Sequence, residues 1–171
     1  MEKKLKRTDV TIRTDIRPGD IGWITYMHAW IYGKEYRYTT TFEAYVAKSL
    51  FDFLMAYNPE RDRLWLAEVD GEIVGSIAIV NRGERAQLRW FLLHPDVRGL
   101  GLGREMLDNA LDYAKKKGFR SVYLDTTSDL DRALDLYARL GFQKVSEKEN
   151  HSWAGSVLEL EMEKMLDAEI F

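Results

Sequence analysis

The chain has 171 residues, a length typical of one domain, and its formal net charge of −3 disfavours a broad nucleic-acid-binding surface. It contains no cysteine, which excludes disulfides, thiol nucleophiles and cysteine-based metal sites. No apolar run approaches the roughly 20 residues that span a bilayer, and no signal-peptide core follows the basic N-terminus. We therefore expect a cytoplasmic protein that binds neither nucleic acid nor membrane.

The sequence predicts one domain over residues 10–166, with a basic tail at 1–9 and a C-terminal tail at 167–171. The first tail is assigned from the run Lys3-Lys4-Leu5-Lys6-Arg7, because short charge runs are usually solvated. No repeat, low-complexity segment or linker divides the rest of the sequence.

Patterns in the first half predict the element order β-α-α-β-β-β. The second helix keeps its apolar residues at helical spacing and ends at Asn58-Pro59. Asp70-Gly71 between two apolar runs predicts a hairpin. The predicted strands cover 10–15, 64–69, 73–80 and 86–93, and the predicted helices 20–32 and 41–57.

The second half continues in the order α-β-α-β-β. A helix over 102–117 carries one apolar face and ends at Gly118, and a later helix is expected to be capped by Asp129 and closed by Gly141. The predicted strands cover 121–124, 143–148 and 157–162. We therefore expect an α+β fold in which a mixed sheet of about seven strands is flanked by about four helices.

A glycine-rich turn, Arg98-Gly99-Leu100-Gly101-Leu102-Gly103, lies between a predicted strand and a predicted helix. Backbone N–H groups at such a helix N-terminus bind phosphate oxygens. The spacing fits neither the dinucleotide pattern G-x-G-x-x-G nor the nucleoside-triphosphate pattern G-x-x-x-x-G-K-[ST]. A turn that serves only close packing of helix and strand is the alternative.

Two motifs together carry a resemblance to a known family. Arg98, Gly101 and Gly103 fit [RQ]-x-x-G-x-[GA], and downstream lies Ala133-x-x-Leu136-Tyr137-x-x-x-Gly141-Phe142. With the element order, these motifs resemble the GNAT superfamily of acyl-CoA N-acyltransferases, from about residue 10 to 162. The resemblance implies the GNAT fold and acetyl-CoA as cosubstrate, with no metal.

A closer resemblance concerns two-part proteins in which a MarR-type winged-helix domain precedes the acetyltransferase. It rests on segments that look like the transferase half of those proteins: 19–23, 35–36, 42–44, 86–90 and 151–153. Since the chain begins at that half, we expect no DNA-binding role of the kind that the other half would carry.

The GNAT resemblance implies a cofactor site on the fourth strand and the glycine turn. The pantetheine arm would lie between the fourth and fifth strands, and the turn would bind the pyrophosphate. The residues expected to bind the cofactor are Leu92, Leu93, Arg98, Gly99, Leu100, Gly101, Leu102, Gly103 and Arg104. The asparagine that often precedes the last helix in this family is replaced by Leu130.

The resemblance also implies direct attack of an amine on the thioester, with Tyr137 as general acid. Gln87 stands where some family members carry a glutamate base, and glutamine cannot accept the proton. Glu35 and Glu43 are the substitutes that we predict for the base. Exposed helix charges are the alternative reading of both.

The acceptor is predicted to be a small-molecule amine or a protein amine, and Tyr32, Tyr36, Arg89 and His151 are its candidate contacts. Alternation places Arg89 on the opposite strand face from Leu88 and Trp90, where it would suit a carboxylate or phosphate. The histidine spacing forms no metal site. A non-catalytic acyl-CoA-binding module is the alternative function, and a homodimer is possible.

Overall fold

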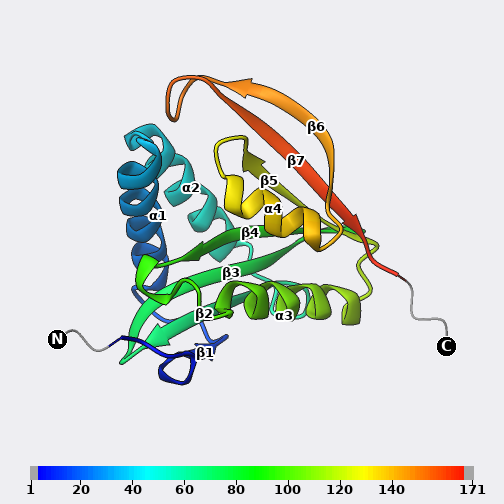
Figure 1. The fold of residues 1–171 in the computed structure, drawn as a ribbon. Helices are drawn as coiled ribbons and strands as arrows, with labels where there is room; N and C mark the ends of the chain where they lie inside the picture. The colour runs from blue at the N-terminus through cyan, green and yellow to red at the C-terminus, as the bar shows by residue number, and fades with distance from the viewer. Residues whose placement is uncertain (1–3, 168–171) are drawn as a thin grey trace.

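The computed structural model describes residues 4–167 and contains one mixed sheet in the strand order β1-β2-β3-β4-β5-β7-β6 (Figure 1). The strands are β1 (Thr11–Arg13), β2 (Arg63–Val69), β3 (Glu72–Arg82), β4 (Arg85–Leu93), β5 (Ser121–Thr127), β6 (Gln143–Asn150) and β7 (Val157–Met165). The helices are α1 (Asp20–Tyr36), α2 (Thr40–Met55), α3 (Leu102–Lys116) and α4 (Asp131–Arg139), and short 3-10 helices cover Arg7–Asp9 and Pro95–Val97. The predicted α+β class and element order are confirmed.

The sheet is covered on both faces, so that two apolar cores form (Figure 1). On one face, which we call the α3 side, Met106 and Leu107 of α3 pack with Tyr137 of α4. On the other, the α1 side, Ile24 and Ile31 of α1 pack with the apolar face of α2. Fully buried side chains of this size each contribute about 1.5–3 kcal/mol to folding.

Several element boundaries differ from the sequence prediction, and three differences bear on the cavity described below. Helix α1 passes the predicted end at residue 32 and continues to Tyr36, and the next residue, Arg37, leaves the helical region with a φ of 59°. Strand β5 runs to Thr127, beyond the predicted end at 124. The predicted cap of α4 by Asp129 is wrong, because the Asp129 carboxylate instead accepts a hydrogen bond from the Tyr38 hydroxyl at 3.1 Å.

Part of the predicted basic tail is packed against the domain. The Arg7 guanidinium donates to both carboxylate oxygens of Glu105 on α3 at 2.6 Å, and Leu5 packs against the α3-side core. Residues 1–3 and 168–171 of the two predicted tails lie outside the described residues.

Strands β4 and β5 pair in parallel only over Arg85–Gln87 and Ser121–Tyr123. Close to the point where they part, β4 carries a bulge, since Ser76 pairs with Leu92 and Ala78 with Arg89, and Trp90 has a φ of 47°. The bulge places Arg89 and Trp90 on the same α1 side, where the Arg89 guanidinium lies 4.7 Å from the Trp90 ring. The prediction that Arg89 and Trp90 face opposite sides of the sheet is therefore wrong. Leu88 does face the side opposite Arg89, as predicted.

Candidate active site

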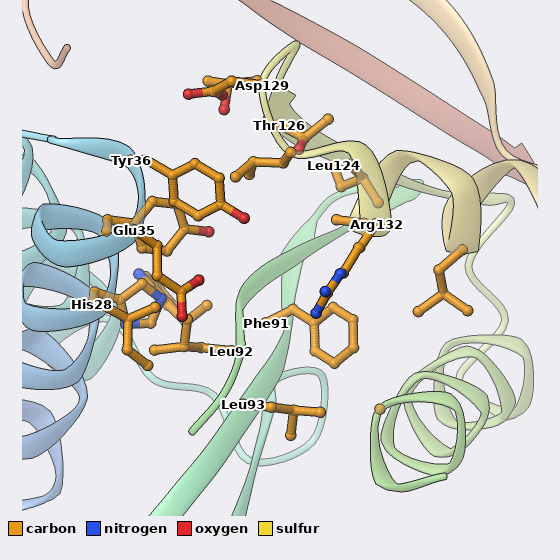
Figure 2. A pocket seen from close by; sticks show the side chains of 18 of the residues that line it. His28, Glu35, Tyr36, Phe91, Leu92, Leu93, Leu124, Thr126, Asp129 and Arg132 are labelled. Carbon is orange, nitrogen blue, oxygen red and sulfur yellow. The ribbon is translucent and has the colours of Figure 1, made fainter. Parts of the chain in front are cut away.

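A cavity of about 920 Å³ opens where β4 and β5 part. Its walls are the β4 residues 88–93, the β5 residues 124–127, the end of α1, the start of α4 and the glycine turn before α3. Figure 2 shows Glu35 and Tyr36 of α1 facing Arg132 of α4, with the β4 residues Phe91 and Leu92 between them.

One end of the cavity is the glycine turn. Gly99 and Gly101 have φ values of 78° and 76°, a conformation that favours glycine, and no atom lies within 4 Å of a Cβ added to either. A Cβ on Gly103 would lie 3.1 Å from Leu93 Cδ1, so glycine allows the close approach of α3 to β4. Helix α3 begins at Leu102, and its first N–H groups have no acceptor within the helix. The turn therefore has the open backbone and the unpaired N–H groups that a backbone phosphate site requires.

Two arginines line the same end. Arg98 donates from both terminal nitrogens to the Glu35 carboxylate, at 2.8 and 3.2 Å, across the cavity from the turn to α1. Arg132, which the sequence analysis did not single out, projects from α4 into the cavity beside Phe91 (Figure 2). Two other predicted cofactor residues lie outside the cavity lining, since Arg104 pairs with Asp108 at 3.1 Å and Leu100 packs against the α3-side core.

The two strand edges form the middle of the cavity. Leu92 and Leu93, which were predicted to border the pantetheine arm, both line it. Beyond Gln87 the β4 edge is not paired with β5, so its N–H and C=O groups on that edge are available to an extended ligand.

Tyr137 closes the cavity on the α3 side. Its side chain is 6% exposed and packs beside Phe91 and Phe142, with ring centroids 6.4 and 5.7 Å away. Burial raises the pKa of the Tyr137 hydroxyl above its usual value. Among the described residues this hydroxyl has no hydrogen-bond partner, and the residue lines the cavity. A neutral phenol so placed can donate a proton to a group in the cavity.

Asp125 of β5 lies across from Tyr137, on the α1 side. Its side chain is exposed to solvent, yet partial desolvation raises the pKa of its carboxyl group, and Glu161 on the neighbouring strand raises it further, whereas the Arg89 charge lowers it. Gln87 Nε2 donates to Asp125 Oδ2 at 3.1 Å, and Arg82 Nε donates to Gln87 Oε1 at 2.9 Å. Although Gln87 cannot itself act as a base, its amide holds the Asp125 carboxylate in place at the site.

The part of the cavity next to α2 and the β6–β7 loop is rich in aromatic side chains. We call it the acceptor half, because the sequence predicts acceptor contacts there. Tyr45 of α2 lies 5.0 Å from Trp153 of the β6–β7 loop, between ring centroids, and Phe42 and Tyr38 continue the wall. The predicted contacts Tyr32, Tyr36 and Arg89 also line the cavity.

Glu43 and His151 are not among the residues that line the cavity. Glu43 is exposed in the first turn of α2, and the exposed His151 ring lies 3.2 Å from Glu149. Of the two predicted bases, the structure brings only Glu35 to the cavity, at its cofactor end.

The comparisons with known proteins agree with this geometry. The family model described as "Acetyltransferase (GNAT) family" matches residues 25–142, more than half of the chain. The chain belongs to the GNAT acetyltransferase family.

The uncharacterized N-acetyltransferase YjgM of Escherichia coli is 30% identical over 101 residues, which are 57% of this chain and 60% of that protein. An acetyltransferase from Streptococcus agalactiae has the same fold, with a TM-score of 0.74, 19% identity and coverage of 92% and 99% of the two chains. YncA from Salmonella typhimurium was solved with its cofactor acetyl-CoA, and it matches with a TM-score of 0.68, 16% identity and coverage of 95% and 97%. The chain thus spans less than two thirds of the curated relative.

The residues of the GNAT cavity fit acetyl-CoA. The open space over the two positive-φ glycines and the free helix N-terminus suit its pyrophosphate, and the unpaired β4 edge suits the amides of its pantetheine arm. Among residues 4–167, no group of three or more His, Asp or Glu side chains is arranged to hold a metal ion, and no helix is long and apolar enough to cross a membrane.

Proposed function

We propose that the protein is an N-acetyltransferase that moves the acetyl group of acetyl-CoA to an amine by direct attack. The observation that carries this proposal is the position of a carboxylate and a phenol on opposite sides of the opening between β4 and β5. Asp125 lies on the α1 side and the Tyr137 phenol on the α3 side, and both line the cavity that begins at the glycine turn.

Acetyl-CoA supplies an activated acetyl thioester. The glycine turn binds its phosphates, while the β4 edge aligns the arm so that the thioester reaches the point where β4 and β5 part. The amine approaches from the aromatic half of the cavity.

Asp125 then accepts a proton from the attacking ammonium group, directly or through water. An ordinary alkylammonium has a pKa of about 10.4, so its deprotonation at neutral pH costs roughly 4–5 kcal/mol. A carboxylate whose pKa is raised is a better proton acceptor than an unperturbed one. As the new C–N bond forms and the C–S bond breaks, the Tyr137 hydroxyl gives its proton to the departing thiolate, and the second proton of the amine nitrogen restores the Tyr137 hydroxyl, directly or through water.

Gln87 and Arg82 are positioning residues in this scheme. The Gln87 amide holds Asp125 Oδ2, and Arg82 fixes the amide orientation by donating to its oxygen. This arrangement also explains how a chain with glutamine at the expected base position can keep a base.

The test is an acceptor screen with purified protein and acetyl-CoA, in which thiol release and product mass are measured together. We expect at least one amine to be acetylated and the Tyr137→Phe variant to be slower with that amine. Binding of acetyl-CoA without acetylation of any amine would overturn the enzyme proposal and favour an acyl-CoA-binding module. A kinship with the transferase half of MarR-type proteins, a cytoplasmic location and a homodimer remain predictions from sequence.

A further inference from the structure

Arg89 and Asp125 lie at equivalent positions on the two edges of the strand opening. Gln87 of β4 pairs with Tyr123 of β5, and Arg89 and Asp125 each come two residues later. Gln87 holds Asp125 on the α1 side of the sheet, and alternation with Leu88 places Arg89 on that side as well, where its guanidinium lies over the Trp90 ring. The mouth of the acceptor half therefore carries one cation and one anion that face the same space.

Both of these groups have only neutral hydrogen-bond partners. Arg89 donates to the Tyr45 hydroxyl at 3.2 Å and stacks on Trp90, and Asp125 accepts from the Gln87 amide. Within residues 4–167, no ion pair within 4.0 Å involves either of them. A guanidinium has five N–H donors in a planar fork that matches a carboxylate, so most of the binding capacity of Arg89 is available.

Of the other charged groups in the cavity lining, Arg132 lies on α4 beside Phe91, while Glu159 and Arg98 are already paired. Glu159 also lines the cavity, but it accepts from Lys148 at 3.1 Å and from Asn150 at 3.2 Å. At the opposite end, Arg98 is paired with Glu35 at 2.8 Å. Arg89 and Asp125 thus form the complementary pair that a ligand with one positive and one negative group would satisfy.

The aromatic wall next to this pair is apolar. Tyr45 and Trp153 face each other across α2 and the β6–β7 loop, and Phe42 lies 5.3 Å from Trp153 between ring centroids. Large apolar or aromatic groups pack favourably on such a surface. A diamine of the same size would place its second ammonium group near Arg89, where the two like charges repel each other.

We propose, on the basis of the proposed acetyltransferase function, that the acceptor is a free α-amino acid with a large apolar or aromatic side chain. Its carboxylate binds Arg89, its amine is held at Asp125, and its side chain lies against Tyr45 and Trp153. In the transfer, the ammonium nitrogen gains the acetyl group and loses two protons, the first to Asp125 before attack and the second as the C–S bond breaks. The thiolate of coenzyme A gains one proton from Tyr137, and the second proton of the amine nitrogen restores the Tyr137 hydroxyl, directly or through water.

The test compares acceptors that differ only in the carboxylate: phenylalanine with phenethylamine, and tryptophan with tryptamine. We expect the wild-type kcat/KM to be higher for each amino acid by about tenfold or more, because an unsatisfied binding group discriminates strongly against the shorter analogue. Arg89→Gln should lower kcat/KM for both acceptors unequally: the loss for phenylalanine should exceed the loss for phenethylamine by a factor on the order of 100. Arg89→Lys should recover part of this loss, since it restores the charge without the fork.

The matched control is Arg120→Gln, which removes an exposed arginine far from the cavity lining and should leave both rates unchanged. Thermal unfolding of each variant checks that it folds. Equal or better acetylation of the decarboxylated amines, or an equal effect of Arg89→Gln on both acceptors, would overturn the amino-acid assignment while leaving the acetyltransferase proposal standing. Failure of wild-type protein to acetylate any amine would overturn both.

Discussion

His28 makes the stability of the fold depend on pH in a defined window. Its side chain is 4% exposed on α1, and its Nδ1 atom lies 2.8 Å from the Ile24 carbonyl oxygen, to which it donates. Burial lowers the pKa of His28 to about 4, and the nearby Arg89 charge lowers it as well. The ring stacks on Tyr32, with centroids 6.0 Å apart, and stays neutral at pH 7.

The sign of the effect follows from the proton balance. The unfolded chain binds a proton at His28 with a pKa of about 6.5, whereas the folded protein resists it until about pH 4. The contribution to stability is complete above pH 6.5 and is lost as the pH falls toward 4. At 1.36 kcal/mol per pKa unit, the loss is about 2 kcal/mol at pH 5 and about 3 kcal/mol at pH 4.

Urea unfolding followed by circular dichroism at pH 7.5, 6 and 5 measures this loss. His28→Phe keeps a ring of similar size against Tyr32 but cannot titrate. Between pH 7.5 and 5, its unfolding free energy should therefore fall by about 2 kcal/mol less than that of the wild type. The control His151→Gln removes a histidine of the exposed β6–β7 loop and should follow the wild type. Parallel pH profiles for wild type and His28→Phe would refute the reasoning.

Substitutions at four further positions test the site. Tyr137→Phe should lower kcat about 100-fold or more while the Kd for acetyl-CoA stays near wild type, and equal losses in both would instead indicate a packing role. Asp125→Asn should lower kcat/KM about 100-fold at pH 7, with a smaller loss at pH 10, where a much larger fraction of the amine is neutral in solution. A loss that does not vary with pH would argue against a base. Gly101→Asp should abolish acetyl-CoA binding measured by calorimetry, and Gly101→Ala, which carries the same backbone strain of about 1–2 kcal/mol without the charge, should bind more tightly than Gly101→Asp. Arg132→Gln should raise the Kd for acetyl-CoA several-fold, and an unchanged Kd would remove Arg132 from the cofactor site.

The sequence predicts the element order well because each element is marked locally. Asp70-Gly71 sets the β2–β3 turn, where both residues have positive φ, and the apolar periodicity of α2 ends near Pro59. The glycine turn is predictable for the same reason, since its conformation depends on residues adjacent in sequence.

The candidate base could not be found in this way. The predicted fifth strand ended at residue 124, one position before Asp125, because the polar run that follows resembles a loop. The structure continues β5 to Thr127 because residues 121–127 pair with β7, which is distant in sequence. Likewise, the predicted first helix ends at residue 32, whereas α1 continues to Tyr36 and brings Glu35 to Arg98.

One backbone irregularity, the β4 bulge at Trp90, explains why the site departs from the sequence pattern. A non-glycine residue with a φ of 47° is unfavourable by on the order of 1–3 kcal/mol. Burial of the Trp90 side chain against Phe53, with a hydrogen bond from its indole N–H to Ser49 at 3.2 Å, offsets this strain. With regular alternation, Arg89 and Trp90 would face opposite sides of the sheet. Arg89 faces the acceptor side by ordinary alternation with Leu88, and the bulge turns Trp90 to the same side. The Trp90 ring therefore lies under the Arg89 guanidinium, next to the point where β4 leaves β5, and supports the cation that the acceptor would meet.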